Sequence, residues 1–232
     1  MRNAFAAWLC RNAENDERVR VLTGDLGFTV FDQFIERYPD RFLNVGVAEQ
    51  NMVGVATGLA EAGYIPFVYS IATFVSMRPY EFIRNGPLLH QLPVRVVGVG
   101  AGFDYGVNGV THYSLEDVAI MRSQPGMAVV SPADRNQTVA ALDAIWDQPS
   151  PFYLRLGKGG DPVPGLEGRF ELSCSTTIRE GSDVALIGLG GITGELAAAA
   201  EELAAQGIEA SVTVVSSLTG ESDPELLRIL SE

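Results

Sequence analysis

The sequence is poor in basic residues and has no long apolar run, and each shortage excludes a class of protein. Its 232 residues include 16 lysines and arginines against 29 aspartates and glutamates, which gives a formal net charge of −13. A groove for nucleic acid and a surface for anionic lipid both need clustered basic side chains, so we expect neither partner. No stretch stays apolar for the roughly 20 residues that cross a bilayer. Charged residues also follow the first apolar stretch too soon for a signal peptide.

Cysteine is equally scarce. The two cysteines, Cys10 and Cys174, lie far apart and fit no metal-binding or redox spacing. We therefore expect two reduced thiols in a protein of the cytoplasm. Apolar residues make up 47% of the chain and charged residues 19%, which is typical of a globular protein with a full core. The acidic composition still allows a small anionic substrate, because a few local arginines can bind one.

Helical and extended patterns alternate along the first part of the chain. Apolar residues at helical spacing predict helices at 3–14, 28–38, 76–90, 114–123 and 133–147. Apolar runs predict buried strands at 19–23, 65–71, 93–99, 127–130 and 152–156. Such alternation predicts an α/β fold, in which a mostly parallel sheet has helices on both faces. Active sites in these folds lie at the carboxyl ends of the strands.

Turn-forming residues separate this part of the chain from a second one. They begin in Gly157-Lys-Gly-Gly-Asp-Pro-Val-Pro-Gly165. Beyond them the patterns predict strands at 183–189 and 210–215 and helices at 194–205 and 224–230. We therefore divide the chain into a first domain, residues 1–160, a linker, residues 161–182, and a small second α/β domain, residues 183–232.

The segment Phe42–Ala62 is the most informative part of the first domain. It begins as a short apolar strand, turns at Gly46 and continues as a helix whose apolar side chains cover most of its circumference. Such a helix is predicted to be buried. Glu49 falls in its first turn, where a carboxylate gains from the helix dipole but finds little water. A glutamate in that place either caps the helix or takes part in chemistry.

The run Asn44-Val-Gly-Val-Ala-Glu-Gln-Asn-Met52 resembles the motif with which transketolase-type enzymes present a glutamate to thiamine diphosphate. The resemblance extends over residues 1–160 and implies the pyrimidine-binding fold of these enzymes. It implies that Glu49 is catalytic and hydrogen-bonds the pyrimidine ring of the cofactor. The reaction would pass a two-carbon ketol unit from a ketose, or a ketose phosphate, to an aldehyde, and the cofactor would supply the carbanion chemistry.

Two further motifs resemble cofactor-binding segments of this family. The run Thr73-Phe-Val-Ser-Met-Arg-Pro-Tyr80 follows a predicted strand, as does the family segment that supplies an aromatic wall for the pyrimidine ring. Phe74 is the candidate for that wall, with Met77 and Tyr80 near it, and a place in the core is the alternative for Phe74. The end of the first strand, Thr23-Gly-Asp-Leu26, makes Asp25 a candidate for the thiazolium side of the cofactor.

The glycine-rich loop that ends in Gly109-Val-Thr-His112 resembles a family segment ending in Gly-Pro-Thr-His, with Val110 in place of the proline. The resemblance implies that His112 points into the active site, where it moves protons or holds a substrate hydroxyl. Asn108 stands where many transketolases have an aspartate that binds a substrate hydroxyl. A second histidine of the family has no counterpart near Gly100. These departures leave the usual sugar-phosphate specificity open.

Arg155, in Phe152-Tyr-Leu-Arg-Leu-Gly157, lies at the end of a predicted strand. The matching arginine of the family binds the phosphate of a sugar phosphate, a task that suits the guanidinium fork. An interdomain salt bridge is the alternative. Lys158 follows, and either assists Arg155 or is solvated.

Two glycine motifs lack what a second cofactor site requires. The run Gly188-Leu-Gly-Gly-Ile-Thr193 has no third glycine of a dinucleotide fingerprint and no acidic residue after the next strand. In Gly24-Asp-Leu26 a leucine replaces the second glycine of the magnesium and diphosphate motif of thiamine enzymes, and Asn44 comes too early to complete it. We therefore expect no metal ligand on this chain. A separate diphosphate-binding, N-terminal-half transketolase subunit would bind Mg²⁺ and complete an α2β2 assembly.

The resemblance also makes residues 183–232 the start of the family's C-terminal domain, so the second domain is expected to be truncated or reduced. Three alternatives stay open. The first is a decarboxylating relative, either the β subunit of a 2-oxo acid dehydrogenase or a deoxyxylulose phosphate synthase. The second is a non-catalytic interaction subunit, and the third is a dinucleotide-binding protein. The Val-Thr-His112 ending favours a transketolase over the dehydrogenase, whereas the donor ketose and the acceptor aldehyde are not determined.

Overall fold

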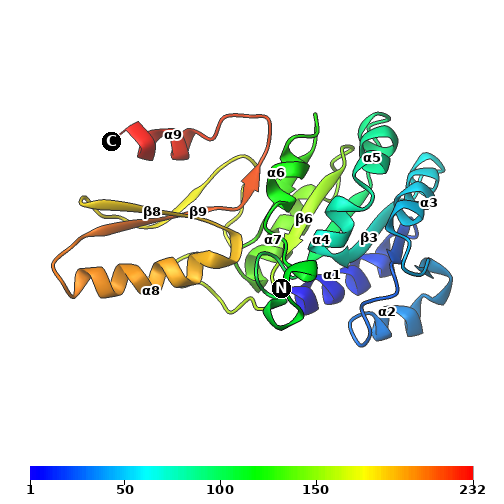
Figure 1. Ribbon diagram of the computed structural model, residues 1–232, viewed down its shortest axis with the longest axis horizontal. Helices are drawn as coiled ribbons and strands as arrows, with labels where there is room; N and C mark the ends of the chain where they lie inside the picture. The colour runs from blue at the N-terminus through cyan, green and yellow to red at the C-terminus, as the bar shows by residue number, and fades with distance from the viewer. Residues whose placement is uncertain (232) are drawn as a thin grey trace.

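The computed structural model describes residues 1–231 and contains two sheets with their covering helices (Figure 1). The first sheet has seven strands in the order β10-β5-β6-β4-β3-β1-β2. Their bounds are β1 Val19–Thr23, β2 Phe42–Asn44, β3 Ile65–Ile71, β4 Arg95–Val99, β5 Ala128–Val130, β6 Phe152–Leu156 and β10 Ser217–Leu218. Every neighbouring pair is parallel except β10 and β5. The predicted mostly parallel sheet is therefore confirmed.

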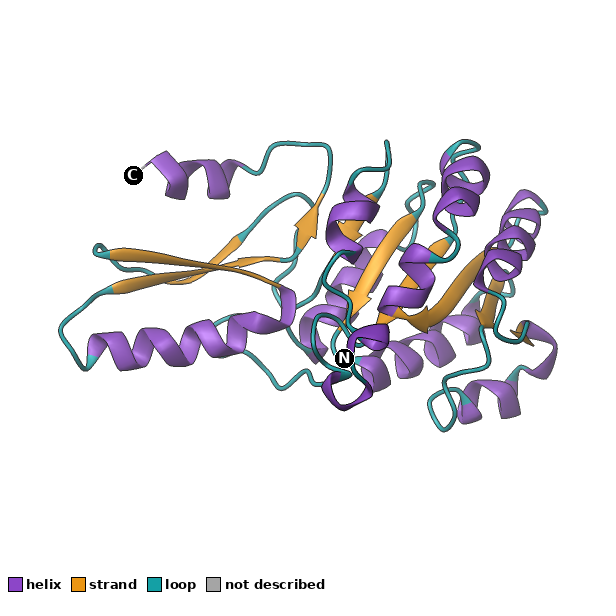
Figure 2. Ribbon diagram, viewed as in Figure 1, coloured by secondary structure: helices purple, strands orange, loops and turns teal. Residues whose placement is uncertain are grey.

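Helices cover both faces of this sheet (Figure 2). They are α1 Arg2–Asn15, α2 Asp32–Arg37, α3 Glu49–Glu61, α4 Ala72–Met77, α5 Tyr80–Ile83, α6 Asp117–Arg122 and α7 Arg135–Ile145. Apolar residues of α1, α2 and α7 form one core cluster with alternate residues of β1, β3 and β4, such as Val21, Phe67 and Val97. Their neighbours on the strands form the second cluster with α3 to α6, as Leu22 and Val68 do. This division follows from the two-residue period of a strand.

Three helices differ from the prediction. The helix expected at 76–90 is divided into α4, α5 and a π-helical turn, Arg84–Leu88, with Pro79 between α4 and α5. Proline lacks the amide that would continue the helix. The helix expected from residue 28 begins only at Asp32. The prediction that α3 is buried on most sides is wrong, because Gln50, Asn51, Gly54 and Gly58 are exposed.

The second sheet has the order β7-β9-β8 and lies at one end of the molecule (Figure 1). Its strands are β7 Thr176–Arg179, β8 Val184–Leu189 and β9 Ala210–Val215, with the helices α8 Thr193–Ala204 and α9 Pro224–Ser231. The predicted linker, residues 161–182, contains β7, which its polar sequence did not indicate. After β9 the chain returns to the first sheet as β10. The division into domains stays a proposal.

The strands position a group of loops at one edge of the first sheet. Because β1, β3, β4 and β6 are parallel, their carboxyl ends lie at the same edge. The segments that follow them carry Asp25, Phe74, His112 and Lys158. Among residues 1–231, no helix has the length and apolar composition to cross a membrane.

Candidate active site

Glu49 is the first residue of α3, and its side chain is only 1% exposed. Its Oε1 accepts a hydrogen bond of 3.0 Å from Ser70 Oγ in β3. Its Oε2 accepts one of 2.7 Å from Arg78 Nη1, directly after α4. Both oxygens thus bond side chains of other elements rather than amides of their own helix. A buried carboxylate costs several kcal/mol unless it is paired, so this geometry favours a chemical role over a cap.

A glycine leaves space beside this carboxylate. A Cβ atom built on Gly24, at the end of β1, would lie 3.3 Å from Glu49 Oε1 and 3.5 Å from the Gly46 carbonyl oxygen. The first approach is tighter than an ordinary van der Waals contact. A side chain at position 24 would therefore crowd the Glu49 carboxylate.

Phe74, Arg78 and His112 continue the group that begins at Glu49. The guanidinium carbon of Arg78 lies 3.9 Å from the centroid of the Phe74 ring. The His112 ring meets the Phe74 ring edge-on, with centroids 5.2 Å apart. Phe74 is half-buried and belongs to neither core cluster, and its ring contacts Arg78 and His112. This favours the aromatic wall over a core position, although contact with a cofactor stays a prediction.

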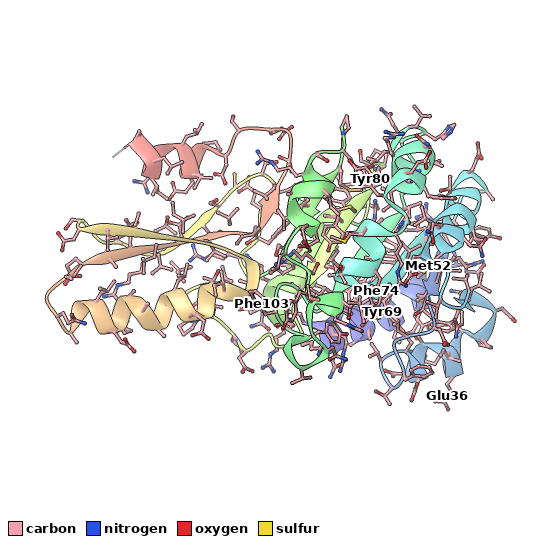
Figure 3. The ribbon with its side chains drawn as sticks, in the orientation of Figure 1. Glu36, Met52, Tyr69, Phe74, Tyr80 and Phe103 are labelled. Atoms are coloured by element: carbon pink, nitrogen blue, oxygen red, sulfur yellow. The ribbon has the colours of Figure 1, made fainter. Side chains whose placement is uncertain are left out.

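Met77 and Tyr80 have different neighbours. Met77 is exposed, and its sulfur accepts a hydrogen bond of 3.5 Å from Thr73 Oγ1. The Tyr80 hydroxyl lies 3.0 Å from Ser123 Oγ, just after α6. Figure 3 shows Tyr80, the first residue of α5, well away from Phe74 in α4. A contact between Tyr80 and the cofactor therefore has no support from these side-chain positions.

Asp25 joins the ends of two strands. Its backbone has a φ of 61°, in the left-handed region, and its Oδ1 accepts a hydrogen bond of 3.0 Å from Asn44 Nδ2. Asn44 Oδ1 in turn accepts from the amides of Asp25 and Gly46, at 3.1 and 3.0 Å. Asp25 is exposed at the edge of the sheet where Glu49 lies. Its role towards the cofactor stays a prediction.

The loop after β4 holds His112 through aromatic neighbours. His112 Nδ1 lies 2.9 Å from Thr111 Oγ1, and the centroid of its ring lies 6.0 Å from that of Tyr105. Gly100 has a φ of 79°, and the Tyr105 ring fills the space that a Cβ would need there. A histidine side chain at position 100 would therefore clash with the Tyr105 ring. Asn108 is exposed in a 3₁₀ helix, Gly106–Asn108, and its contact with a substrate stays a prediction.

Arg155 is held inside the first domain. Its Nε donates a 2.8 Å hydrogen bond to Oδ2 of Asp117 in α6, whose side chain is fully buried, and its own side chain is 14% exposed. The same oxygen accepts a 2.7 Å bond from the Tyr153 hydroxyl. Burial and the Asp117 carboxylate hold the pKa of Tyr153 well above its usual value. Asp117 therefore neutralises Arg155, and phosphate binding by Arg155 stays a prediction.

The sequence motifs assigned no role to Arg78 and only a secondary one to Lys158. Lys158 is the single lysine of the chain. Its Nζ lies 3.4 Å from the centroid of the Tyr105 ring, and no ion pair among residues 1–231 includes it. Arg78 follows Phe74 by four positions, a spacing that places two side chains on one face of a helix. That spacing was the available signal for Arg78.

The glycines after β8 are explained by packing. Gly190 has a φ of 67°, and the space for its Cβ is filled by Ser131 Oγ of the first domain. The Thr193 hydroxyl donates a 2.7 Å hydrogen bond to the Gly190 carbonyl. The run from Gly188 to Thr193 thus packs α8 and β8 against the first domain. This packing explains the glycines without a bound dinucleotide.

Comparisons with known proteins identify the family of the first part of the chain. The family model for the transketolase pyrimidine binding domain matches residues 1–160. The chain is 37% identical to the 6-deoxy-6-sulfo-D-fructose transketolase subunit SqwH of Clostridium sp. (strain MSTE9), over 98% of this chain and 71% of that protein. It is 33% identical to a subunit of the apulose-4-phosphate transketolase of Phocaeicola vulgatus, over 94% of this chain and 70% of that protein.

Two further similarities bear on the reaction and on the fold. The 1-deoxy-D-xylulose-5-phosphate synthase of Desulforudis audaxviator is 34% identical over 90% of this chain and 33% of the synthase. Among solved structures, a split gene transketolase described as an inactive β4 tetramer superposes with a TM-score of 0.82 at 37% identity. That match covers 94% of this chain and 71% of the other.

Proposed function

The chain belongs to the family of the transketolase pyrimidine-binding domain, and on that basis we propose that it is one subunit of a split transketolase dependent on thiamine diphosphate. The observation that carries the proposal is the buried Glu49 carboxylate beside Phe74 and His112. Glu49 occupies the position of the glutamate in the family motif. The enzyme would pass a two-carbon ketol unit from a ketose to an aldehyde.

The residues of the site fit a pyrimidine ring. Glu49 offers a buried carboxylate, Phe74 offers a half-buried ring, and Gly24 places no side chain against the carboxylate. When bound, thiamine diphosphate supplies the carbanion chemistry. Glu49 would hold the pyrimidine ring nitrogen through a hydrogen bond and favour its protonated form. Phe74 would contact the ring face, which contributes roughly 0.5 to 1.5 kcal/mol beyond area burial.

His112 is the proposed second catalytic group. Its half-buried ring lies against Phe74 and Tyr105, on the loop that closes this edge of the sheet. An imidazole there can move a proton to or from a substrate hydroxyl near neutral pH. Asn108 belongs to the same loop and is proposed to bind a substrate hydroxyl through its amide.

A second chain is proposed to hold the diphosphate and Mg²⁺. In the part of the chain that the structure describes, no group of three or more histidine, cysteine, aspartate or glutamate residues is arranged to hold a metal ion. The relatives are named as subunits, and the β4 tetramer is described as inactive, which supports a requirement for a different partner. We propose an α2β2 assembly in the cytoplasm, with active sites between subunits.

The donor ketose is proposed to carry an anionic group. The relatives are named for 6-deoxy-6-sulfo-D-fructose and for apulose 4-phosphate, which carry a sulfonate and a phosphate. Lys158 supports this for the present chain, because its exposed ammonium group lies beside Tyr105 without a carboxylate partner among residues 1–231. We propose that Lys158 binds the anionic end first, and that Arg155 contributes through Nη1, because its Nε donates to Asp117 and its Nη2 donates to the Ser114 carbonyl.

Calorimetric titration of thiamine diphosphate with Mg²⁺ tests the proposal. We expect no binding to this chain alone and saturable binding to its mixture with a diphosphate-binding subunit. Glu49→Gln should still assemble and lose roughly 10²- to 10⁴-fold in ketol transfer, as for loss of an acid–base group. Glu61→Gln, at the exposed end of the same helix, is the matched control and should keep full activity. Retained activity in Glu49→Gln would disprove the assignment.

A decarboxylating reaction is the second candidate, supported by the similarity to a deoxyxylulose phosphate synthase. Incubation of the assembled enzyme with pyruvate distinguishes the two. Release of carbon dioxide would establish the decarboxylating reaction, whereas consumption of a ketose with transfer of two carbons would establish the transketolase. If neither reaction occurs and no cofactor binds, the chain is a non-catalytic subunit.

A further inference from the structure

We propose that the guanidinium group of Arg78 occupies the pyrimidine position of this chain, and that the cofactor must displace it to reach Glu49. Arg78 is then a positioning residue for Glu49 in the cofactor-free state and a competitor of the cofactor. The inference rests on the function proposed above.

Arg78 makes two contacts at once. Its Nη1 donates a 2.7 Å hydrogen bond to Glu49 Oε2, and its guanidinium carbon lies 3.9 Å from the centroid of the Phe74 ring. The first distance is that of a strong, charge-assisted hydrogen bond. The second is van der Waals contact with a ring face. One planar group therefore lies against Phe74 while its edge donates to the buried carboxylate.

An aminopyrimidine ring needs the same two contacts. It is planar, it stacks on an aromatic face, and its ring nitrogen bonds a carboxylate when that nitrogen or the carboxylate carries a proton. A gap of 3.9 Å between the guanidinium carbon and the Phe74 centroid leaves no room for a second planar group. Arg78 in this position and a pyrimidine ring on the same face of Phe74 are thus mutually exclusive.

The cofactor-free chain has a physical reason to keep Arg78 there. Glu49 is 1% exposed, and Ser70 supplies one neutral hydrogen bond, to Oε1. Without the charge of Arg78, the buried carboxylate of Glu49 would lack a counter-charge, which is unfavourable. The side chain of Arg78 is itself 36% exposed, so it can move into solvent without crossing the core.

Competition of this kind changes affinity in a characteristic direction. The apparent dissociation constant of a ligand rises as the fraction of protein with an open site falls. Removing a residue that binds the cofactor weakens binding, whereas removing a residue that blocks its place strengthens it. Because Arg78 is partly exposed, we expect its removal to change the dissociation constant of the cofactor roughly three- to tenfold.

The test compares Arg78→Gln with the wild type in the assembled complex with Mg²⁺. We expect the dissociation constant of thiamine diphosphate, measured by calorimetry, to fall about three- to tenfold. Without cofactor, the same variant should unfold at a lower temperature than the wild type, because Glu49 has lost its partner. Arg84→Gln is the matched control, since Arg84 is exposed and bonds its neighbour Asn85, and it should leave both quantities unchanged.

Arg78→Lys separates the charge of Arg78 from its shape. A lysine keeps the counter-charge of Glu49 but has no planar group to lie on Phe74, so we expect wild-type thermal stability together with tighter cofactor binding. A structure of the cofactor-bound complex gives a second test, in which the bond from Arg78 Nη1 to Glu49 Oε2 should be absent. Weaker or unchanged binding in Arg78→Gln, or an intact bond in that structure, would overturn the inference. Failure of the wild-type complex to bind cofactor would instead overturn the proposed function.

Discussion

Lys158 and Arg155 lie three positions apart at the end of β6, but their charges differ in availability. Arg155 donates to the buried Asp117 carboxylate, whereas Lys158 is exposed and has an aromatic ring as its neighbour. The chain has a net charge of −13, so an accessible cation such as Lys158 beside the candidate site is unusual in it. The family motif contains a counterpart only of Arg155, so the motif alone would assign phosphate binding to Arg155 and not to Lys158.

We predict that Lys158→Gln raises the KM for a ketose phosphate roughly tenfold, equivalent to about 1.4 kcal/mol, and leaves kcat nearly unchanged. The change removes binding that is equal in the ground state and the transition state. Steady-state kinetics with a phosphorylated and an uncharged donor measures it. Lys158→Arg is the control and should retain the wild-type KM. An equal loss with both donors would contradict anion binding by Lys158.

The single lysine offers an independent check at the same scale. Acetylation removes the charge of an ammonium group, and Lys158 carries the single side-chain amine of the sequence that it can modify. Mass spectrometry identifies the modified group. A phosphorylated donor present during the reaction should protect Lys158.

At the scale of elements, Asp117 joins α6 to β6. Its Oδ2 accepts from the Tyr153 hydroxyl and from Arg155 Nε, and both donors belong to β6. Gly98 of the neighbouring β4 makes room for Tyr153, since a Cβ there would lie 2.6 Å from the tyrosine hydroxyl. The buried carboxylate therefore joins α6 to β6, and β4 leaves the space that Tyr153 needs.

We predict that Asp117→Asn lowers the free energy of unfolding by roughly 3 kcal/mol, because breaking a buried ion pair leaves an uncompensated charge. The partial exposure of Arg155 places this value at the lower end of the usual range. Urea unfolding followed by circular dichroism measures it. Glu116→Gln, at the exposed preceding position, should have no effect. Equal stability of Asp117→Asn would show that the pair makes no net contribution.

At the scale of the whole molecule, the two sheets differ in how well they are buried. The first sheet lies between two large core clusters. The second sheet has the smaller clusters, and Val184 and Ile187 of β8 remain exposed, as do Leu227 and Leu230 of α9. The strand β10 connects the two parts, because it pairs with β5 after the chain has left β9.

We predict that the amides of β8 and β9 exchange hydrogen faster than those of β3 and β4. Local opening costs less free energy where fewer apolar contacts are broken. Native-state hydrogen exchange read by mass spectrometry compares the two sheets within one sample, so the first sheet is an internal control. Equal protection would show that the chain unfolds as a single cooperative unit.

The α/β class, the bounds of most strands and the position of Glu49 follow from the sequence alone. These features are local, because apolar runs and helix starts depend on neighbouring residues. The sequence did not indicate β7, whose polar residues form the edge of a small sheet, and it placed too much of α3 in the core. The exposure of Gly54 and Gly58 depends on which elements pack against α3, not on their own sequence.

The pairing of the charged residues at the candidate site follows only from the tertiary structure. Arg78 meets Glu49 across 29 positions of sequence, and Arg155 meets Asp117 across 38. Neither pair follows from spacing, because each depends on the order β6-β4-β3-β1 that brings the strand ends together. The sequence therefore determined which chemical groups are present, and the strand order decided which of them are neutralised and which remain available.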